Sequence, residues 1–288
     1  MAKVLKGKPV AQDIIKGTQQ TVEDLNKINV FPKLTIVRVG DDPSSISYET
    51  AAIKTMNQVG IEVESVVFDS NVEVETVIQA IEELNRDYAV HGILVMQPLP
   101  ASIDRNDIAR HIQPTKDIDG LTPMNLGRVV ENDPTTLEPS TPRAVMALLA
   151  YYNIGIEGKD ICVIGSSPVV GKPLTVMLLN AEATVTNLHI KSKDVKKYTK
   201  EADIIISATG ATELVTADYI KEGAVVIDVG FGYKDGKPVG DVKYDEVSKK
   251  ASAITPVPGG VGSITTAILA EQVTQAAWMM RSDEDSGH

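Results

Sequence analysis

The sequence has few of the residues that form disulfides or hold metals. Its 288 residues include one cysteine, Cys162, so no disulfide can form within the chain. The four histidines and this cysteine show no spacing typical of metal ligands. No apolar run reaches the roughly 18 residues that span a bilayer. The N-terminus lacks the apolar segment of a secretory signal peptide. We therefore expect a cytoplasmic protein without a bound metal.

Positive charge is also scarce. Lys plus Arg number 28 against 39 Asp plus Glu, which gives a net charge of −11. A general nucleic-acid binder needs a basic face, so this balance argues against that class and leaves open only a local basic patch. Hydrophobic residues make up 43% of the chain and charged residues 23%, which is typical of a folded globular protein. We expect neither nucleic acid nor a membrane as a partner.

Short β-branched runs alternate with helical segments along the chain. Runs of this kind, largely apolar, are typical of parallel strands covered by helices on both faces. The pattern predicts an α/β fold, with strands over 33–39, 61–67, 92–95, 161–164, 184–187, 203–207 and 224–229. It predicts helices over 45–59, 72–85, 141–152 and 265–280, and a disordered polar tail over 281–288.

The segment that follows the predicted strand 161–164 is rich in glycine and serine. It begins Gly165-Ser166-Ser167 and reaches Val170-Gly171 before the next helix. Glycine permits a tight turn close to a pyrophosphate, and the start of a helix favours an anion. The spacing is not the dinucleotide pattern GxGxxG, so an ordinary strand-to-helix turn remains the alternative. The four-strand context favours nucleotide binding.

Three other segments have two readings each. The Asp117-Ile118-Asp119-Gly120 loop offers carboxylates for ligand N–H groups or for proton transfer, but Asp before Gly also serves an ordinary turn. Tyr48 on a predicted helix is either a packing residue or part of a site. The glycine-rich loop 256–262 is either a connector or a ligand loop, and its composition just before a helix favours the ligand loop.

Taken in order, these segments resemble the methylenetetrahydrofolate dehydrogenase/cyclohydrolase family along nearly the whole chain. Each piece is short, but their order and spacing agree, which makes the resemblance specific. The matching segments are 39–61, 92–95, 116–121, 140–142, 165–173, 226–230, 240–242 and 255–262.

The resemblance implies two α/β domains. A folate-binding catalytic domain would cover 1–122 plus 266–288, and a Rossmann-type, doubly wound NAD(P)-binding domain would cover 140–265, with 123–139 as the connection. The last helix would return to pack on the first domain. Family members usually form homodimers through their nucleotide domains.

The resemblance also implies residue roles. Tyr48 would stack on the pterin of the folate, and Asp119 would hold the pterin N–H groups, for which a carboxylate acceptor is suited. Pro258, Gly259 and Gly260 would lie beside the nicotinamide and the folate. We expect the ligands in a cleft between the domains. Expected contacts to the nucleotide are Gly165, Ser166, Ser167, Val170, Gly171, Ile190, Lys191, Ala208, Thr209, Gly210, Asp228 and Gly230.

Two departures from the family pattern concern hydrolysis of the methenyl product. The family lysine four residues after the tyrosine is Ala52 here, and the family glutamine that works with it is Met96. Lys54 and Gln97, at shifted positions, are the candidate replacements. We predict a methylenetetrahydrofolate dehydrogenase of one-carbon metabolism and purine biosynthesis with weak or absent cyclohydrolase activity. A fully bifunctional enzyme and a catalytically inactive binding protein are the alternatives.

The expected cofactor is NADP, with NAD as the alternative. No acid ends the second strand of the nucleotide domain, where NAD enzymes often bind the ribose hydroxyls. Lys191, Ser192 and Lys193 follow instead and suit a 2′-phosphate. Against NADP stand Ser166 and Ile190, where family members often carry arginine and serine.

Overall fold

The computed structural model describes residues 2–286, with side chains as far as residue 282. The chain divides into two compact units. The folate unit, as we name it from the expectation above, comprises Gln12–Ser140 and Thr266–His288, and the nucleotide unit comprises Met1–Ala11 and Thr141–Thr265. The two units are described separately. None of the described helices has the length and apolar character needed to cross a membrane.

The folate unit contains a parallel sheet of order β3-β2-β4. The strands are β2 (Lys33–Val39), β3 (Glu62–Phe68) and β4 (Gly92–Val95). The central strand β2 pairs Leu34 with Val63 on one side and with Gly92 on the other. Most side chains of β2 are buried on both faces, which explains its continuous apolar character.

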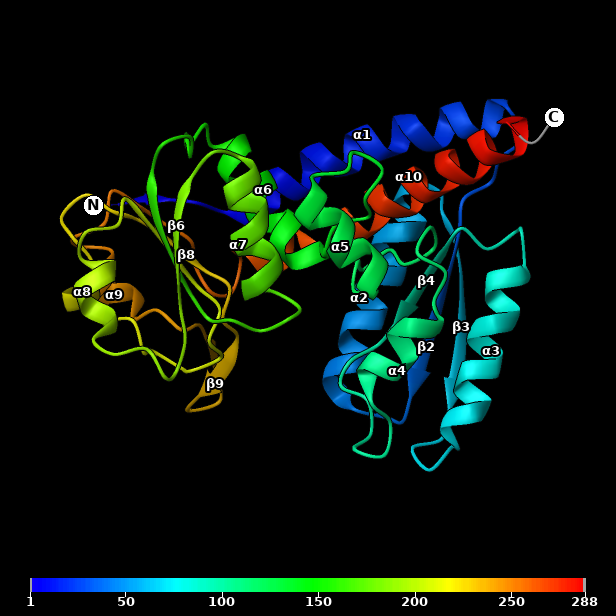
Figure 1. Cartoon of the computed structure of the whole chain (residues 1–288), viewed down its shortest axis with the longest axis horizontal. Helices are drawn as coiled ribbons and strands as arrows, with labels where there is room; N and C mark the ends of the chain where they lie inside the picture. Colours follow the sequence, from blue (N-terminus) through cyan, green and yellow to red (C-terminus); the bar gives the residue numbers. More distant parts are fainter. Residues whose placement is uncertain (1, 287–288) are drawn as a thin grey trace. The chain divides into compact units, whose positions relative to one another are not determined.

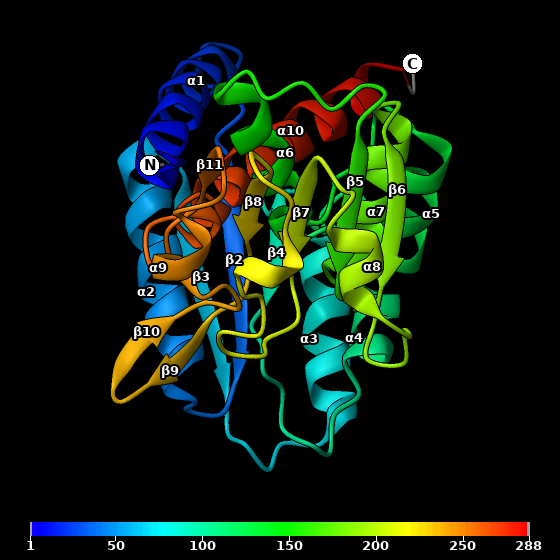
Figure 2. The same cartoon turned by 90° about the vertical axis from the view of Figure 1, so that its left-hand side faces the viewer.

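Helices cover both faces of this sheet. On one face, α2 (Pro43–Val59) packs on Leu34 and Ile36 of β2. On the other, α3 (Val74–Arg86) and α4 (Arg105–His111) pack on Val37 and Val39. Figures 1 and 2 show α3 and α4 on the same side of the sheet, away from α2. The folate unit is therefore a three-layer α/β/α arrangement.

The final helix, α10 (Thr265–Ser286), belongs to the folate unit for almost its whole length. Its buried residues Leu269, Val273 and Ala276 join the cluster formed by β2 and α2, as predicted for a helix that returns to the first domain. The predicted disordered tail at 281–288 is wrong as far as Ser286, because the helix continues to that residue. Residues 287–288 lie outside the described residues.

The segment 113–142 contains one further helix of the folate unit, α5 (Pro123–Glu131). Pro123 stands in its first turn, where a missing N–H has no cost, and Thr122 caps it by accepting from the Asn125 N–H. The next helix, α6 (Ser140–Tyr151), starts near the predicted position. The long helix α1 (Gly7–Lys27) was not predicted, and its Val22 packs in the same cluster as α2.

The nucleotide unit contains a six-stranded sheet of order β1-β11-β8-β7-β5-β6, and every pairing in it is parallel. Its strands are β1 (Lys3–Val4), β5 (Asp160–Ile164), β6 (Thr184–Leu188), β7 (Ile204–Ser207), β8 (Val225–Asp228) and β11 (Ala253–Ile254). Figure 2 shows β8, β7, β5 and β6 in this order. The strand order reverses at β5, because β6 lies on one side of it and β7 on the other.

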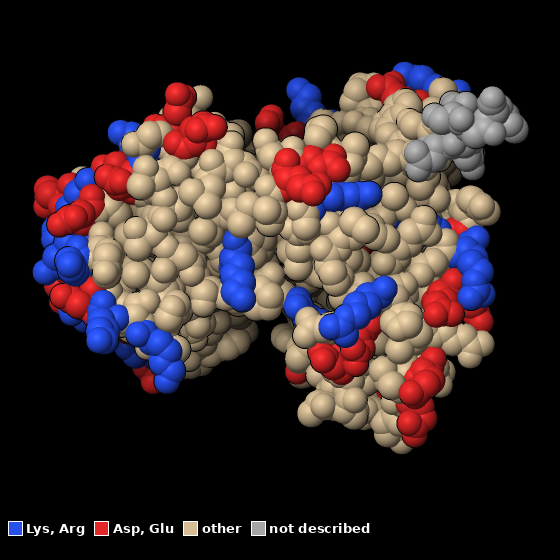
Figure 3. Space-filling view, viewed as in Figure 1, with Lys and Arg blue, Asp and Glu red and all other residues tan. Residues whose placement is uncertain are grey.

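Apart from α6, which belongs to the nucleotide unit from Thr141 on, the remaining elements of this unit are short. They are α7 (Gly171–Asn180), α8 (Val195–Thr199), α9 (Tyr244–Val247), the 3-10 turns Ala217–Tyr219 and Val261–Ser263, and a hairpin of β9 (Gly232–Lys234) and β10 (Lys237–Val239). β1 pairs with β11, so the first residues lie with this sheet, whereas the predicted domain boundaries put them with the folate segment. On the face drawn in Figure 3, the basic side chains of the described residues are intermixed with acidic ones.

Candidate active site

The turn after β5 is built on two glycines that nothing larger can replace. Gly165 has a φ of +124°, and a Cβ there would lie 2.3 Å from the Ala208 carbonyl oxygen. A Cβ on Gly171, the first residue of α7, would lie 2.0 Å from the Gly165 carbonyl oxygen. The strand end and the helix start are thus in direct backbone contact. In a parallel sheet, the turn that follows a strand at which the strand order reverses is suited to binding a nucleotide pyrophosphate.

Side chains around this turn hold it in shape. Ser167 Oγ accepts from the backbone N–H groups of Val170 and Gly171, at 3.2 and 3.4 Å. Asn187 of β6 donates to the Gly165 carbonyl at 2.9 Å. Ser166 is partly exposed beside them. The cradle fits a dinucleotide phosphate, because its glycines leave room for a ligand to approach the backbone.

The turn after β6 presents Ile190 and Lys191 to solvent. Ile190 is 97% exposed, and Lys191 is exposed beside it. Ser192 Oγ accepts from the His189 N–H at 2.9 Å, and His189 Nδ1 accepts from the Lys191 N–H at 3.1 Å. These bonds form a tight turn at the same sheet edge as Gly165, since the carboxyl ends of parallel strands share an edge.

The turn after β7 contains the predicted contacts Ala208, Thr209 and Gly210. The Ala208 N–H donates to the Ile164 carbonyl of β5 at 2.8 Å, and Gly210 has a φ of +69°. The Thr209 N–H donates to Asp241 Oδ2 at 2.6 Å. Asp241 also accepts from Ser207 Oγ at 2.9 Å, so it fixes this turn from the other side of the sheet edge. Asp241 lies in the segment 240–242 that resembles the family, but no role was predicted for it.

Asp228, a predicted cofactor contact at the end of β8, is engaged by the protein's own backbone. Its carboxylate accepts from the N–H groups of Gly230 at 2.9 Å, Asp241 at 3.1 Å and Val242 at 2.9 Å. Burial raises its pKa to about 6 against these hydrogen bonds, with a smaller contribution from the charge of Asp241. A Cβ on Gly230 would lie 2.0 Å from Asp241 Oδ1. The Asp228 side chain therefore holds the Gly230 loop in place.

The loop 258–260, predicted to lie beside both ligands, belongs to the nucleotide unit. Val257–Pro258 is a cis peptide, and Gly259 has a φ of +100°. Gly259 accepts from the Gly7 N–H at 2.8 Å, and a Cβ on Gly7 would lie 2.0 Å from the Gly260 carbonyl oxygen. Pro258 and Gly259 are exposed and Gly260 is buried. The loop is anchored at its base and free at its tip.

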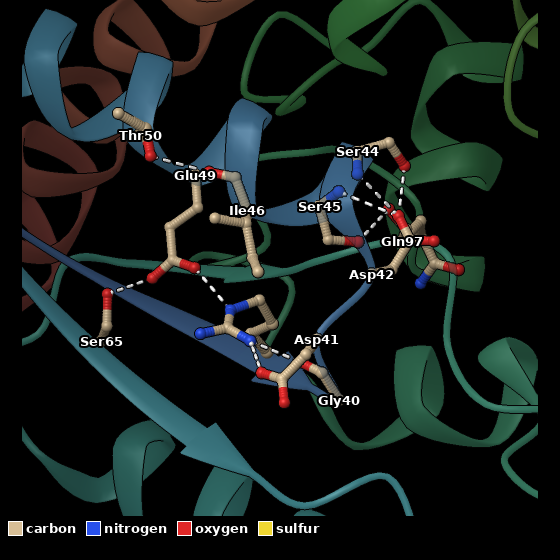
Figure 4. Close-up of polar contacts among 11 residues, drawn as sticks. Gly40, Asp41, Asp42, Ser44, Ser45, Ile46, Glu49, Thr50, Ser65 and Gln97 are labelled. Carbon is tan, nitrogen blue, oxygen red and sulfur yellow. Dashed lines mark hydrogen bonds and ion pairs between the residues drawn. The ribbon is translucent and has the colours of Figure 1, made fainter.

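In the folate unit, the start of α2 positions the loop after β4. Asp42 Oδ1 caps the helix by accepting from the N–H groups of Ser44 and Ser45, at 2.9 and 3.1 Å. Ser45 Oγ donates to the Gln97 carbonyl oxygen at 2.8 Å (Figure 4). Gln97 is exposed, and its peptide bond to Pro98 is cis. The predicted substrate residue Gln97 is thus tied through its backbone to the first turn of α2.

A buried ion pair fixes the orientation of α2. Arg38 Nε donates to Glu49 Oε2 at 2.7 Å, and Ser65 Oγ donates to Glu49 Oε1 at 2.6 Å (Figure 4). Arg38 also contacts the Gly40 carbonyl and the Asp41 carboxylate. The contacts of Glu49 with β2 and β3 fix the rotation of α2 about its axis. They therefore also fix the direction in which the neighbouring Tyr48 side chain leaves the helix.

Tyr48, Ala52 and Met96 lie in one apolar cluster. Ala52 is 0% exposed and Met96 is 3% exposed, and the partly buried Tyr48 packs against the cluster that contains both. Tyr48 and Ala52 share a face of α2 because they are four residues apart. Lys54 is exposed on another face of α2. The structure therefore brings Tyr48 together with the two substituted positions and does not bring Lys54 to them.

The two acids of the Asp117–Gly120 loop have different environments. Asp117 is buried, and its Oδ2 accepts from the Thr122 N–H at 2.7 Å and from Asn125 Nδ2 at 3.0 Å, so it shapes the loop. Asp119 is partly exposed and accepts from Ser140 Oγ. Burial raises the pKa of Asp119 to about 7, and the nearby charge of Asp117 adds to this rise.

A small cavity of about 30 Å³ lies beside Asp119 within the folate unit. Gln97, Arg105, Asp117 and Asp119 supply its polar lining, and the rest is apolar. The structure therefore places Gln97 and Asp119 at one cavity. Arg105 has no motif around it, and sequence reasoning missed it.

Both domain models of one family match this sequence. The model described as tetrahydrofolate dehydrogenase/cyclohydrolase, catalytic domain, matches residues 5–119. The NAD(P)-binding domain of the same family matches residues 139–281. The chain belongs to the tetrahydrofolate dehydrogenase/cyclohydrolase family.

Relatives of this family match along their full length. The protein named bifunctional protein FolD from Alkaliphilus metalliredigens is 44% identical over 277 residues, which are 96% of this chain and 98% of that protein. The crystal structure of the bifunctional FolD enzyme from Campylobacter jejuni superposes with a TM-score of 0.95 at 41% identity, covering 97% of this chain and 99% of that one.

A third family member was solved with ligands. The Trypanosoma brucei enzyme, described as complexed with NADP cofactor and inhibitor, has a TM-score of 0.91 at 34% identity and covers 98% of each chain. Among the described residues of the present chain, no group of three His, Cys, Asp or Glu side chains is arranged to hold a metal ion.

Proposed function

We propose that this chain oxidises 5,10-methylenetetrahydrofolate to 5,10-methenyltetrahydrofolate with a nicotinamide dinucleotide. The observation that carries the proposal is Asp119. It is a carboxylate at a largely apolar cavity, with one hydroxyl donor from Ser140 and remaining capacity to accept. The N3–H and 2-amino groups of a pterin are donors that suit this capacity. The family membership supports the same substrate class.

The chain's own residues bind and orient the reactants in this proposal. Asp119 holds the pterin by its N–H groups, and Tyr48 packs on the ring face from α2. The Gly165–Gly171 turn holds the dinucleotide phosphates. The cofactor supplies hydride-accepting chemistry when bound. The lone pairs of folate N5 and N10 stabilise the cationic product, so no protein base is required for this oxidation.

We propose further that hydrolysis of the methenyl product is weak or absent. Water must be activated beside the bridging carbon, and a proton must later reach a folate nitrogen. Ala52 has no titratable group, and Met96 offers no useful hydrogen bond. Both are buried in the apolar cluster beneath Tyr48. Loss of a positioned acid–base group reduces a rate by about 10²–10⁴-fold.

A fully bifunctional enzyme is the second candidate, because the relatives named above are described as bifunctional. In that case the hydrolytic step needs a group other than residues 52 and 96. Gln97 lines the Asp119 cavity and Lys54 is exposed on α2, so Gln97 is the better placed of the two.

One assay with two substrates separates these candidates. Methylenetetrahydrofolate is supplied with NADP or NAD, and formation of reduced cofactor is followed by absorbance. Methenyltetrahydrofolate is then supplied alone, and its decay is compared with the spontaneous rate in the same buffer. We expect reduced cofactor to form, methenyl-folate to accumulate, and its decay to equal the spontaneous rate.

Variants test which residues are responsible for the weak or absent hydrolysis of methenyl-folate. The double change Ala52→Lys with Met96→Gln should accelerate methenyl-folate decay, and Lys54→Ala should leave both reactions unchanged. Clear acceleration by the unmodified protein would favour the bifunctional candidate. A flat trace in both assays, with folded protein that still binds folate, would favour an inactive binding protein.

We propose NADP as the preferred cofactor, with NAD as the alternative. Lys191 and Ser192 follow β6 at the sheet edge that carries Gly165, and no carboxylate ends that strand. Exposed Ile190 and partly exposed Ser166 are the residues least suited to a 2′-phosphate. A kinetic preference for NAD of about tenfold or more, equivalent to about 1.4 kcal/mol, would overturn this choice.

We also propose that the chain forms a homodimer through its nucleotide unit, as the family resemblance implies. Light scattering coupled to gel filtration should report twice the mass of one 30.9 kDa chain. A monomer mass at assay concentrations would contradict the proposal.

A further inference from the structure

Helix α4 begins with a partly exposed arginine whose guanidinium group lacks a complete set of partners. Arg105, its first residue, donates from Nη2 to Asn106 Oδ1 at 3.1 Å. Its Nη1 is buried and has no hydrogen-bond partner among the described residues. A buried donor without a partner costs about 1–3 kcal/mol, so such a group in a native protein calls for a functional explanation.

The unpartnered nitrogen belongs to a residue that lines the Asp119 cavity. Arg105 and Asp119 both lie at this cavity, with apolar side chains such as Ile108 and Leu121 between the polar ones. The charge of Arg105 lowers the pKa of Asp119, opposing the rise that burial and Asp117 cause. The residues that line the cavity therefore include both a hydrogen-bond acceptor, Asp119, and an arginine with an unpartnered donor, Arg105.

We propose that Arg105 is a specificity residue that donates from Nη1 to the 4-oxo oxygen of the pterin. The proposal rests on the folate-binding function proposed above. A pterin carries a 2-amino donor, an N3–H donor and the O4 acceptor in a row along one edge. Asp119 accepts from the two donors, and Arg105 supplies the donor that the neighbouring oxygen needs.

The cavity's size limits how much of the ligand enters it. Its volume of about 30 Å³ is enough for the polar atoms at one edge of the ring and not for the whole ring. An oxygen atom that enters an apolar cavity loses its water partners. A charged donor at that point restores the lost hydrogen bond, whereas a pterin with an amino group at C4 would place a donor against a donor.

The test compares two ligands that differ at C4 and, with it, at N3, which carries a hydrogen in folic acid and none in the 4-amino counterpart. Because the difference at N3 is the same for both proteins, the change in the affinity ratio on Arg105→Met reports on the C4 substituent. Binding of folic acid and of its 4-amino-4-deoxy counterpart is measured by calorimetry for the unmodified protein and for Arg105→Met. Because a charge-assisted hydrogen bond is lost, folic acid should bind about 10- to 100-fold more weakly to the variant. The 4-amino ligand should change by less than about threefold. The ratio of the two affinities, which should favour the 4-oxo ligand in the unmodified protein, should therefore be much smaller in Arg105→Met.

The controls separate this role from a structural one. Arg110→Met removes an exposed arginine of the same helix, which pairs with Asp107 at 2.6 Å, and should leave both affinities unchanged. Arg105→Lys should restore part of the 4-oxo preference. Because Arg105 lowers the pKa of Asp119, Arg105→Met should also move the midpoint of folic acid binding to higher pH, and Arg110→Met should not.

Two results overturn the inference in distinguishable ways. An unchanged ratio of the two affinities in Arg105→Met, with the unmodified protein binding folic acid, rejects the role of Arg105 and leaves the proposed function intact. Failure of the folded, unmodified protein to bind either ligand rejects the proposed function and the role of Arg105 together.

Discussion

Asp119 in the folate unit and Asp228 in the nucleotide unit are similar residues in different roles. Burial raises the pKa of both, to about 7 and about 6. Asp228 is surrounded by three backbone N–H donors from its own unit. Asp119 accepts from one hydroxyl, that of Ser140, and lines a cavity. Both residues share burial and a raised pKa, so these properties do not distinguish the proposed pterin acceptor from a carboxylate held by the backbone of its own unit. Unused accepting capacity distinguishes the two carboxylates.

Removing the Asp228 carboxylate should have the larger effect on folding. Asp228→Ala leaves three buried N–H groups without their acceptor, so we expect the free energy of unfolding to fall by about 2–4 kcal/mol. Urea unfolding measures this change. Asp245→Ala, at an exposed position nearby, should change it by less than about 0.5 kcal/mol. Equal stability of the two variants would remove the structural role assigned to Asp228.

Removing the Asp119 carboxylate should have the larger effect on binding. Asp119→Ala loses a charge-assisted contact to the pterin, and the folate affinity should fall by about 1.5–3 kcal/mol. Equilibrium binding of tetrahydrofolate measures this loss. The free energy of unfolding of Asp119→Ala should not fall at neutral pH, because ionisation of this carboxyl group, with its raised pKa, opposes folding. In this it should differ from Asp228→Ala. Unchanged folate affinity would show that Asp119 does not hold the pterin.

A change of pH should have a smaller effect than either substitution, and the effect should have opposite signs for folate binding and for folding. Below a pKa of about 7, Asp119 becomes protonated and loses one accepting site, so folate affinity should fall by up to about tenfold for each pH unit. Folding shows the opposite sign, because a raised carboxyl pKa favours the folded state at low pH and that stabilisation is lost as pH rises through 7. Folate binding that is flat between pH 5 and 8 would contradict the assignment.

Local sequence signals predicted the glycine turn and the strands β2 to β8, whose apolar runs are local features, but they did not predict the short strands β1, β9, β10 and β11. The Gly165–Gly171 turn follows from glycines that alone tolerate the close backbone contact. The family resemblance led to the expectation that Asp228 contacts the cofactor, but it does not show the backbone N–H groups that surround this carboxylate.

Long-range contacts account for what the sequence could not show. The partnerless Nη1 of Arg105 depends on the packing of α4 beside the Asp117–Gly120 loop, which no spacing in the chain encodes. The burial of both Ala52 and Met96 in one cluster likewise joins two segments about 44 positions apart. The helical continuation to Ser286 was missed because the polar residues 281–286 have no apolar periodicity.

The return of α10 to the folate unit sets an order of events during synthesis. Gln272 donates to the Ile118 carbonyl at 2.6 Å, and Leu269 and Val273 fill the core against β2 and α2. These residues are synthesised after the strands of both units, since the nucleotide unit has its six sheet strands, β1 included, by Ile254. The folate unit therefore lacks part of the cover over Ile36 and Leu94 until α10 has been synthesised. A nascent chain stalled before α10 would present this incomplete core to chaperones.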